Sequence, residues 1–305
     1  MRDIFKIESI AQLNKLMQQD TTKHPLVTVV DFTKMDGYNT ESPKLTSSFY
    51  SVMLKNRCHS NLKYGRQYYD FEEGTLVFIA PEQVIEMENE PEPKEQEEPI
   101  IGWGLFFHPD LLRGTSLASK MRDFTFFSYD THEALHLSEK EKQLLADIIS
   151  KIEYELDQNI DKHSQSLIVS NIELLLNYCT RFYDRQFITR KNNNKDILAK
   201  FENIVINYFG SEEIKQKGLP SVKFCADKLN LSANYLSDLL KKETGKNAQE
   251  HIHYYLIEEA KNLLLSTHVT VSEIAYDLGF EYPQYFSKMF KKKTGMTPAE
   301  FRNLN

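Results

Sequence analysis

The C-terminal third of the chain repeats itself at a period of about 50 residues, which favours an architecture of two equivalent units. In each copy, four apolar residues have the spacing i, i+3, i+4, i+7 of one helix face: Val222, Cys225, Ala226 and Leu229, then Val271, Ile274, Ala275 and Leu278. A turn follows in both copies, and then a second apolar stripe: Leu236, Leu239 and Leu240, then Phe286, Met289 and Phe290. A short helix, a tight turn and a second helix with an inward stripe form the helix-turn-helix pattern, so the repeat predicts two such units.

Helix start signals support this interpretation. Thr270 with Glu273, and Thr297 with Glu300, have the spacing of capping boxes, in which each side chain bonds to the other residue's backbone N–H. Ser232 is placed to cap the second helix of the first copy.

The face opposite the second apolar stripe is polar in both copies. It carries Asn234, Ser237, Asp238, Lys241 and Lys242 in the first copy and Gln284, Ser287, Lys288, Lys291 and Lys292 in the second. The polar groups near its start can bond to base edges in the major groove, and the lysines at its end suit phosphates. One such face would be an ordinary solvated surface, but two in the same register indicate double-stranded DNA as the ligand.

Four stretches of this region carry a family resemblance: LSANYLSDLLKKETG (231–245), IEEAKNLLL (257–265), SEIAYDLGF (272–280) and YFSKMFKKKTGMTPAEFR (285–302). On these motifs, residues of about 197–303 resemble the DNA-binding region of AraC/XylS-type transcription regulators. The resemblance implies two helix-turn-helix units joined by a long helix, with both recognition helices in the major groove. It places the base-reading positions at Asn234, Ser237, Asp238, Gln284, Tyr285 and Lys288.

Two positions depart from the pattern of that family. Asp238 is acidic where relatives often have a basic or neutral residue, and Leu256 stands where many have arginine. A carboxylate can accept from a cytosine amino group but repels phosphate. We therefore expect the first copy to bind DNA less tightly by itself.

The overall charge is compatible with DNA binding once the chain is divided. The formal net charge is -7, but residues 195–305 carry 15 Lys and Arg against 14 Asp and Glu, so the acidity belongs to the front of the chain. No apolar run is long enough for a membrane span, and the first residues do not resemble a signal peptide. Because the three cysteines are widely spaced, we expect a cytoplasmic protein without disulfides.

The front of the chain has the pattern of short β-strands. Apolar and aromatic runs occupy 26–32, 48–55, 74–80 and 100–107, which is typical of a sandwich or small barrel. GTLVFIAPEQ (74–83) resembles the cupin-like barrel that AraC/XylS regulators often carry, so we place a barrel at about 20–130. Residues 86–99 contain seven Glu and three Pro, and their composition predicts a solvated loop.

Two helices are predicted after the barrel, at 138–184. Ser138 and Glu141 form a capping-box signature for the first, and the second runs from about 164 to 183. Three successive leucines, 174–176, point in different directions around that second helix, so one barrel surface cannot cover all of them. We therefore predict a homodimer through these helices. The polar segment 185–195 is interpreted as a linker.

The expected fold class is α+β with two domains. Residues 1–184 form a cupin-like sensor and dimerisation domain, 185–195 a linker, and 196–305 an all-α domain with two helix-turn-helix units. A small barrel can hold one ligand. Candidate residues for binding a small-molecule effector are Tyr50, Arg57, Tyr64, Arg66, Tyr68 and Trp103, although alternation along the strands leaves open which point inward.

These observations favour a DNA-binding regulator under effector control, with RNA polymerase as a further partner if it activates transcription. An alternative is a regulator whose front domain only dimerises or binds a protein partner. A cupin-type enzyme is a remote alternative, because the β region contains no HxH motif for a metal and no nucleotide-binding fingerprint occurs. We expect no catalytic residues, metal or cofactor.

Overall fold

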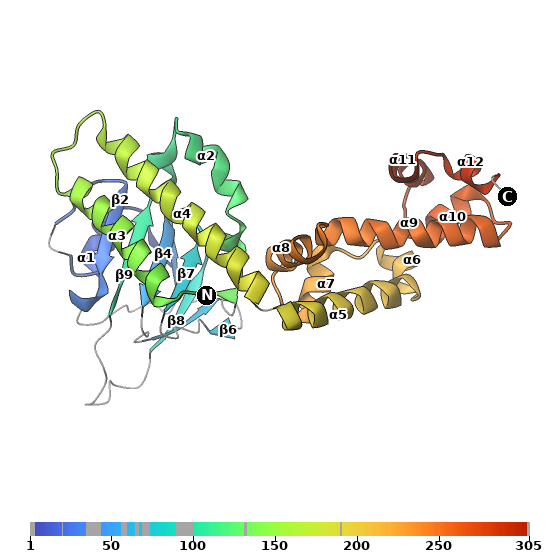
Figure 1. The fold of residues 1–305 in the computed structure, drawn as a ribbon, viewed down its shortest axis with the longest axis horizontal. Helices are drawn as coiled ribbons and strands as arrows, with labels where there is room; N and C mark the ends of the chain where they lie inside the picture. The colour runs from blue at the N-terminus through green and yellow to red at the C-terminus, as the bar shows by residue number, and fades with distance from the viewer. Residues whose placement is uncertain are drawn as a thin grey trace. The chain divides into compact units, whose positions relative to one another are not determined.

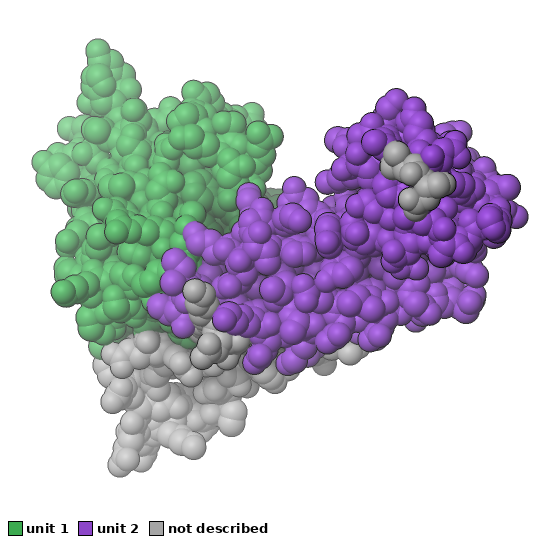
Figure 2. Space-filling view, turned by 45° about the vertical axis from the view of Figure 1, so that its right-hand side comes forward, with its two compact units in different colours: residues 1–186 green, residues 187–305 purple. Residues whose placement is uncertain are grey.

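The computed structural model divides the chain into two compact units, residues 1–186 and 187–305 (Figure 2). It describes residues 4–19, 21–34, 44–55, 60–64, 67–68, 74–89, 101–130, 133–189 and 191–303. The division between the units falls inside the segment predicted as a linker. That segment is helical on both sides of Arg190, since α4 (Ser164–Thr189) ends and α5 (Lys191–Phe209) begins there.

Two five-stranded sheets form the centre of the first unit. One has the order β1 (Phe5–Ile7), β3 (Lys44–Ser47), β8 (Ile85–Asn89), β5 (Ser60–Tyr64) and β6 (Gln67–Tyr68). The other has the order β10 (Leu135–His136), β7 (Thr75–Ile79), β4 (Tyr50–Lys55), β9 (Gly102–Phe107) and β2 (Val27–Asp31). Strands β1 and β3 pair in parallel, and the neighbouring strands of the second sheet pair antiparallel.

One apolar core lies between the two sheets. Its buried side chains come from both of them and from α1 (Ile10–Leu16), and include Ile7, Leu13, Leu45, Met53, Ile79 and Phe106. This two-layer arrangement agrees with the predicted sandwich or barrel, and closure into a cupin-like barrel stays a prediction. The opposite face of the second sheet carries aromatic residues, among them Tyr50 and Phe78.

The acidic segment was predicted to be a loop, and this prediction was wrong for residues 86–89. They belong to β8, which pairs with β3 and β5. In the sequence, apolar Ile85 and Met87 alternate with glutamates, as in a strand with one buried face. Because the segment is rich in Glu and Pro, its composition indicated a loop although residues 85–89 alternate as in a strand. Residues 90–99 lie outside the described residues.

After β10, the last strand that the structure describes, two long helices cover the second sheet (Figure 1). Helix α3 (Glu139–Leu156) begins at the predicted Ser138–Glu141 capping box, and α4 extends six residues beyond the predicted end at 183. The extension has a tertiary cause. Arg185 Nη2 donates to the His136 carbonyl at 2.8 Å, and Gln186 Oε1 accepts from the His136 N–H at 2.9 Å. These polar side chains thus hydrogen-bond to β10 and do not form a flexible connection.

Between β9 and α3 the chain forms short helical turns. They are η2 (Pro109–Leu112), α2 (Ser116–Lys120), η3 (Met121–Asp123) and η4 (Thr125–Ser128). Phe126 and Phe127 of η4 pack on Phe78 of β7, with ring centroids 4.4 and 5.4 Å apart. Tyr183 of α4 stacks on Phe126 at 5.6 Å, so these aromatic rings join sheet and helix.

The described part of the second unit is helical. After α5 come α6 (Glu213–Lys217), α7 (Val222–Leu229), α8 (Ala233–Thr244), α9 (Ala248–Ser266), α10 (Val271–Asp277), α11 (Pro283–Thr294) and α12 (Pro298–Arg302). Helix α9 joins the two repeats (Figure 1). Leu256, one of the two residues that depart from the pattern of the resembled family, is fully buried in the core of the second repeat with Phe286 and Phe290. Among the helices that the structure describes, none combines the length and the hydropathy of a membrane-spanning segment.

Candidate nucleic-acid interface

The first repeat folds into α7, a turn and α8, each limited by local hydrogen bonds. Ser221 Oγ accepts from the Phe224 N–H at 3.0 Å, and Ser232 Oγ accepts from the Tyr235 N–H at 3.1 Å. Asn230 forms the turn in the left-handed region, at φ 54°. Asparagine tolerates that conformation better than most residues. The hydrogen bond from the Tyr235 N–H to Ser232 Oγ confirms the predicted cap of α8.

In the second repeat, a glycine takes the left-handed turn position that Asn230 occupies in the first. Thr270 and Glu273 bond reciprocally as the predicted capping box of α10. Gly279 then has φ +79°, and a Cβ atom there would lie 2.7 Å from the Ile214 carbonyl oxygen. Glycine is required on both grounds. Helix α11 begins with Pro283, whose fixed φ suits a first helical position.

Both second helices end in the same way. The N–H of Gly245 and that of Gly295 each donate to a lysine carbonyl four residues earlier, at 2.9 Å in both copies. Thr244 Oγ1 donates to the Leu240 carbonyl at 2.8 Å, and Thr294 Oγ1 to the Phe290 carbonyl at 2.9 Å. The lysines therefore occupy equivalent last turns, where positive charge is favourable to the helix dipole.

None of the predicted DNA-contacting residues is buried. Eight are exposed: Asn234, Lys241, Lys242, Gln284, Tyr285, Lys288, Lys291 and Lys292. Ser237, Asp238 and Ser287 are half-buried at the margins of the same faces. The buried residues of α8 are Tyr235, Leu236, Leu239 and Leu240, and those of α11 are Phe286 and Phe290. Each helix thus presents one polar face to an outside partner.

The two polar faces differ in charge. In α8, Lys241 and Lys242 are balanced by Asp238 and Glu243, whereas α11 carries four lysines and no acid. The fourth of these lysines, Lys293, is exposed and was missed in the sequence analysis because it lies outside the i, i+3, i+4 pattern. The second helix is therefore the more attractive one for a polyanion.

A pair of exposed tyrosines lies at the start of α11. Tyr282 and Tyr285 are in edge-to-face contact, with ring centroids 5.8 Å apart. Sequence reasoning identified Tyr285 but not Tyr282, because the latter precedes the helix. An aromatic pair beside Gln284 supplies apolar surface and two hydroxyl groups next to an amide that can bond to adenine.

The described residues bear on two other chemistries, metal binding and thiol reactivity. They contain no group of three or more His, Cys, Asp or Glu that could hold a metal ion. His251 and His253 lie on one helix but contact different partners, Thr244 Oγ1 at 2.7 Å and Gln249 Nε2 at 2.9 Å. Burial raises the pKa of the Cys225 thiol to about 11, which keeps it protonated at neutral pH.

Among the candidate effector residues, Tyr50 and Trp103 have side chains that the structure describes. Tyr50 stacks on Phe107, with ring centroids 5.3 Å apart. Both rings lie on the outer face of the second sheet, opposite the core that lies between the two sheets. Trp103 is three positions from the inward-facing Phe106, so strand alternation places it on that outer face too. Tyr64 and Tyr68 lie in β5 and β6, but their side chains are outside the described residues, as are Arg57 and Arg66.

Comparison with known proteins agrees with this geometry. A family model described as a helix-turn-helix domain matches residues 225–304. The uncharacterized transcriptional regulatory protein YesN of Bacillus subtilis is 36% identical over 109 residues, which are 35% of this chain and 28% of that protein. The HTH-type transcriptional activator RhaR of Escherichia coli K12 is 34% identical over 83 residues, 27% of this chain and 29% of that protein.

A solved structure is similar to about a third of the chain. It is the C-terminal domain of the two-component response regulator yesN from Fusobacterium nucleatum, 35% identical, covering 33% of this chain and 96% of that one with a TM-score of 0.29. The matched segment spans less than a third of the length of the two curated relatives. The residues matched by the family model lie within the C-terminal unit.

Proposed function

We propose, from the premise that the C-terminal unit is an AraC-type helix-turn-helix domain, that this chain is a sequence-specific transcription regulator. The matched helix-turn-helix segment confirms the resemblance of this part of the chain to AraC/XylS regulators. The observation that carries the proposal is the pair of helices α8 and α11, equal in length and in end geometry, each with an exposed polar face.

Helices α8 and α11 contribute to DNA binding in different ways. Helix α11, with its four lysines, supplies most of the attraction to the phosphate backbone. Helix α8, with balanced charge, contributes mainly through Asn234, Ser237 and Asp238 at base edges. Such a protein needs both contacts for specificity, but α11 dominates its affinity for DNA of any sequence.

The front unit supports dimerisation through α3 and α4. Leu175 and Leu176 are fully buried, while Leu174 is 40% exposed and Leu167, two turns earlier on the same face, is 46% exposed. Full burial of a leucine stabilises by about 1.5–3 kcal/mol, so covering the exposed part of each of these two contributes about 0.6–1.4 kcal/mol and favours a second surface over this stripe. The occupant we propose is the same stripe of a second copy.

Control by a small molecule completes the proposal. The effector binds in the front unit and alters DNA binding, and RNA polymerase is a further partner if the protein activates transcription. Since its ligand is genomic DNA, such a regulator acts in the cytoplasm of a bacterial cell.

DNA selected from a random pool with the full-length protein provides the test. We expect Gln284→Ala to reduce discrimination between selected and random DNA by about 1–3 kcal/mol. Lys292→Ala should weaken binding to selected and to random DNA about equally. It should also lower the slope of log affinity against log salt concentration by about one. Fluorescence anisotropy at several salt concentrations measures both effects.

Lys200→Ala is the matched control, because it removes an exposed lysine from α5, outside both recognition helices. It should leave affinity and salt dependence nearly unchanged. If Lys200→Ala weakens binding as much as Lys292→Ala, or if Gln284→Ala affects selected and random DNA equally, the proposed interface is wrong.

A further inference from the structure

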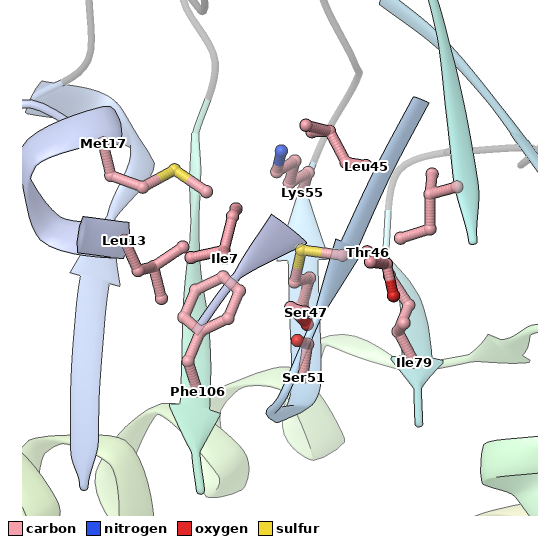
Figure 3. Close-up of a pocket in the computed structure, with 12 residues that line it drawn as sticks. Ile7, Leu13, Met17, Leu45, Thr46, Ser47, Ser51, Lys55, Ile79 and Phe106 are labelled. Carbon is pink, nitrogen blue, oxygen red and sulfur yellow. The ribbon is translucent and has the colours of Figure 1, made fainter. Parts of the chain in front are cut away.

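Two exposed aromatic side chains lie together at the start of α11. In the first unit, an aromatic ring such as Phe106 is enclosed by apolar side chains such as Ile7 and Leu13 (Figure 3). Tyr282 and Tyr285, by contrast, are 49% and 60% exposed although their rings are in contact. Exposed apolar groups that lie together, rather than singly, are typical of binding surfaces.

The start of α11 lacks a side-chain cap. Helices α7, α8, α9, α10 and α12 each begin after a Ser, Thr or Asn whose side chain accepts from a backbone N–H of the first turn. Tyr282 has the same position before α11 and makes no such bond. Because a cap stabilises a helix, a tyrosine at this position is unfavourable to the fold. Its presence is explained if the ring contacts a molecule outside the chain.

The two rings form a right-angled corner. Their centroids are 5.8 Å apart and their planes are inclined by 85°, so the edge of one ring meets the face of the other. The Tyr285 N–H donates to the Tyr282 carbonyl at 3.0 Å, and this hydrogen bond fixes the turn that brings the rings together. Such a corner is bounded by a face of each ring. It can therefore enclose a small apolar group, such as a methyl group, on two sides.

The corner adjoins the polar face of α11. Exposed Gln284 directly precedes Tyr285, and exposed Lys288 follows Tyr285 by three residues, the spacing of neighbours on a helix surface. In helix-turn-helix proteins, the first residues of the second helix contact base edges in the major groove. The methyl group that the major groove presents is that of thymine. The position of the corner therefore favours a thymine as its occupant.

In the first repeat, the two equivalent positions are used for folding. They are Ser232 and Tyr235 of the α8 region. Ser232 Oγ caps the helix, and Tyr235 is 5% exposed, with its ring 5.1 Å from that of Phe187. A methyl group in the groove therefore meets an aromatic surface at the start of α11 and a polar one at the start of α8.

We propose that Tyr282 and Tyr285 hold the methyl group of a thymine in the block of DNA contacted by α11. This assignment deepens the DNA-binding function proposed above and rests on it. Gln284 can bond to an adenine beside that thymine, so the amide and the corner together select A·T pairs. Tyr282, which precedes the helix, is thereby a specificity-determining residue of the second repeat.

Uracil in place of thymine tests the contact without any change in the protein. Deoxyuridine keeps the base pair and removes only the methyl group. In a site selected by the full-length protein, each thymine is replaced in turn, and fluorescence anisotropy gives the affinity. The block of α11 is the one at which Gln284→Ala loses discrimination. We expect at least one replacement there to weaken binding about fourfold or more, as the loss of one buried methyl group implies. No loss at any thymine of that block, or a block without thymine, would overturn the proposal.

Two substitutions of Tyr282 separate the ring from its hydroxyl group. Tyr282→Phe keeps the ring and should keep the preference for thymine over uracil, whereas Tyr282→Ser should bind both sites about equally. Because serine can cap α11 as it caps α7 and α8, Tyr282→Ser should have a Tm no lower than that of the wild type. The loss of the preference is then not a loss of the fold.

Tyr276→Ala is the matched control, because it removes a 55% exposed tyrosine from α10, outside both recognition helices. It should leave the preference for thymine unchanged. A preference that survives in Tyr282→Ser, or that disappears in Tyr282→Phe, would show that the ring of Tyr282 does not hold the methyl group.

The methyl contact and the DNA-binding function fail separately. If the wild type discriminates selected from random DNA but not thymine from uracil, the DNA-binding function stands and the methyl contact is wrong. If Tyr282→Ser binds DNA as the wild type does but activates purified RNA polymerase less, the two rings contact protein and the methyl contact is again wrong. If the wild type does not discriminate between DNA sequences, both proposals are wrong, because a methyl contact is itself a form of discrimination.

Discussion

Individual glycines of the second unit have similar backbone angles but different surroundings. Gly245 and Gly279 have φ of +78° and +79°. A Cβ atom at Gly245 would meet nothing within 4 Å, whereas at Gly279 it would lie 2.7 Å from the Ile214 carbonyl oxygen and 2.9 Å from the Cα atom of Gly218. The turn of the second repeat therefore depends on close backbone packing as well as on conformation.

This difference predicts unequal effects of two alanine substitutions. Gly245→Ala should lower the free energy of unfolding by about 1–2 kcal/mol, the cost of a left-handed alanine. Gly279→Ala should lower it by at least about 3 kcal/mol, because two backbone segments must also move apart. Urea denaturation measures both values. Similar losses in the two variants would show that the second repeat does not need the close contact.

Residues such as Lys55, Arg185 and Gln186 have roles that sequence patterns alone do not indicate. Each is polar, and composition assigns such residues to surfaces or linkers. Their roles come from partners far away in the chain: Phe32 for Lys55, and His136 for Arg185 and Gln186. No local pattern contains that information.

Among helices and strands, those with local determinants were predictable. The capping boxes at Thr270 and Thr297 and the turn between α7 and α8 follow from residues within a few positions of one another. Strand β8 pairs with β3 and β5, which lie far from it in the chain, whereas β6 pairs with its sequence neighbour β5, and none of these three strands was predicted. Their short polar sequences carry little signal apart from the alternation that begins at Ile85.

The capping box of α10 predicts a pH dependence of stability. Hydrogen bonds from the Thr270 backbone and side chain hold the pKa of Glu273 below its usual value. A lowered folded pKa means that the carboxylate stabilises the fold above the unfolded pKa, and this contribution is lost as the pH falls through the folded pKa. Glu273→Gln should therefore lower the Tm at pH 7, and the difference from wild type should shrink in acid below about pH 4.

Thermal melts of both proteins from pH 7 down to pH 3 provide the comparison. Glu281→Gln, an exposed glutamate in the loop before α11, is the control and should show no such trend. A difference in Tm that stays constant over this range would mean that the Glu273 charge does not contribute through the cap.

At the scale of the whole molecule, the exposed stripe on α4 predicts the oligomeric state. Leu167→Asp with Leu174→Asp should convert a dimer into a monomer at about ten micromolar, because covering the exposed part of each leucine contributes about 0.6–1.4 kcal/mol and a carboxylate in the interface loses its hydration. Sedimentation velocity of the full-length protein gives the result directly. Ile206→Asp, which replaces an exposed apolar residue of α5, should leave the dimer intact. A wild-type protein that sediments as a monomer would remove α4 as the interface.

Helix α4 does not stop at the end of the first unit. Its last turns supply Phe187, whose ring lies 5.1 Å from that of Tyr235 on α8, and buried Asn194 of α5 donates to the Phe187 carbonyl and to Glu243. The segment that contains Phe187 and Asn194 thus forms part of the core that supports α8. Recombination that exchanges front halves at this point would deprive Tyr235 and Glu243 of their neighbours. Functional hybrids should therefore have their junction before Phe187, so that this residue is inherited together with the helices it supports.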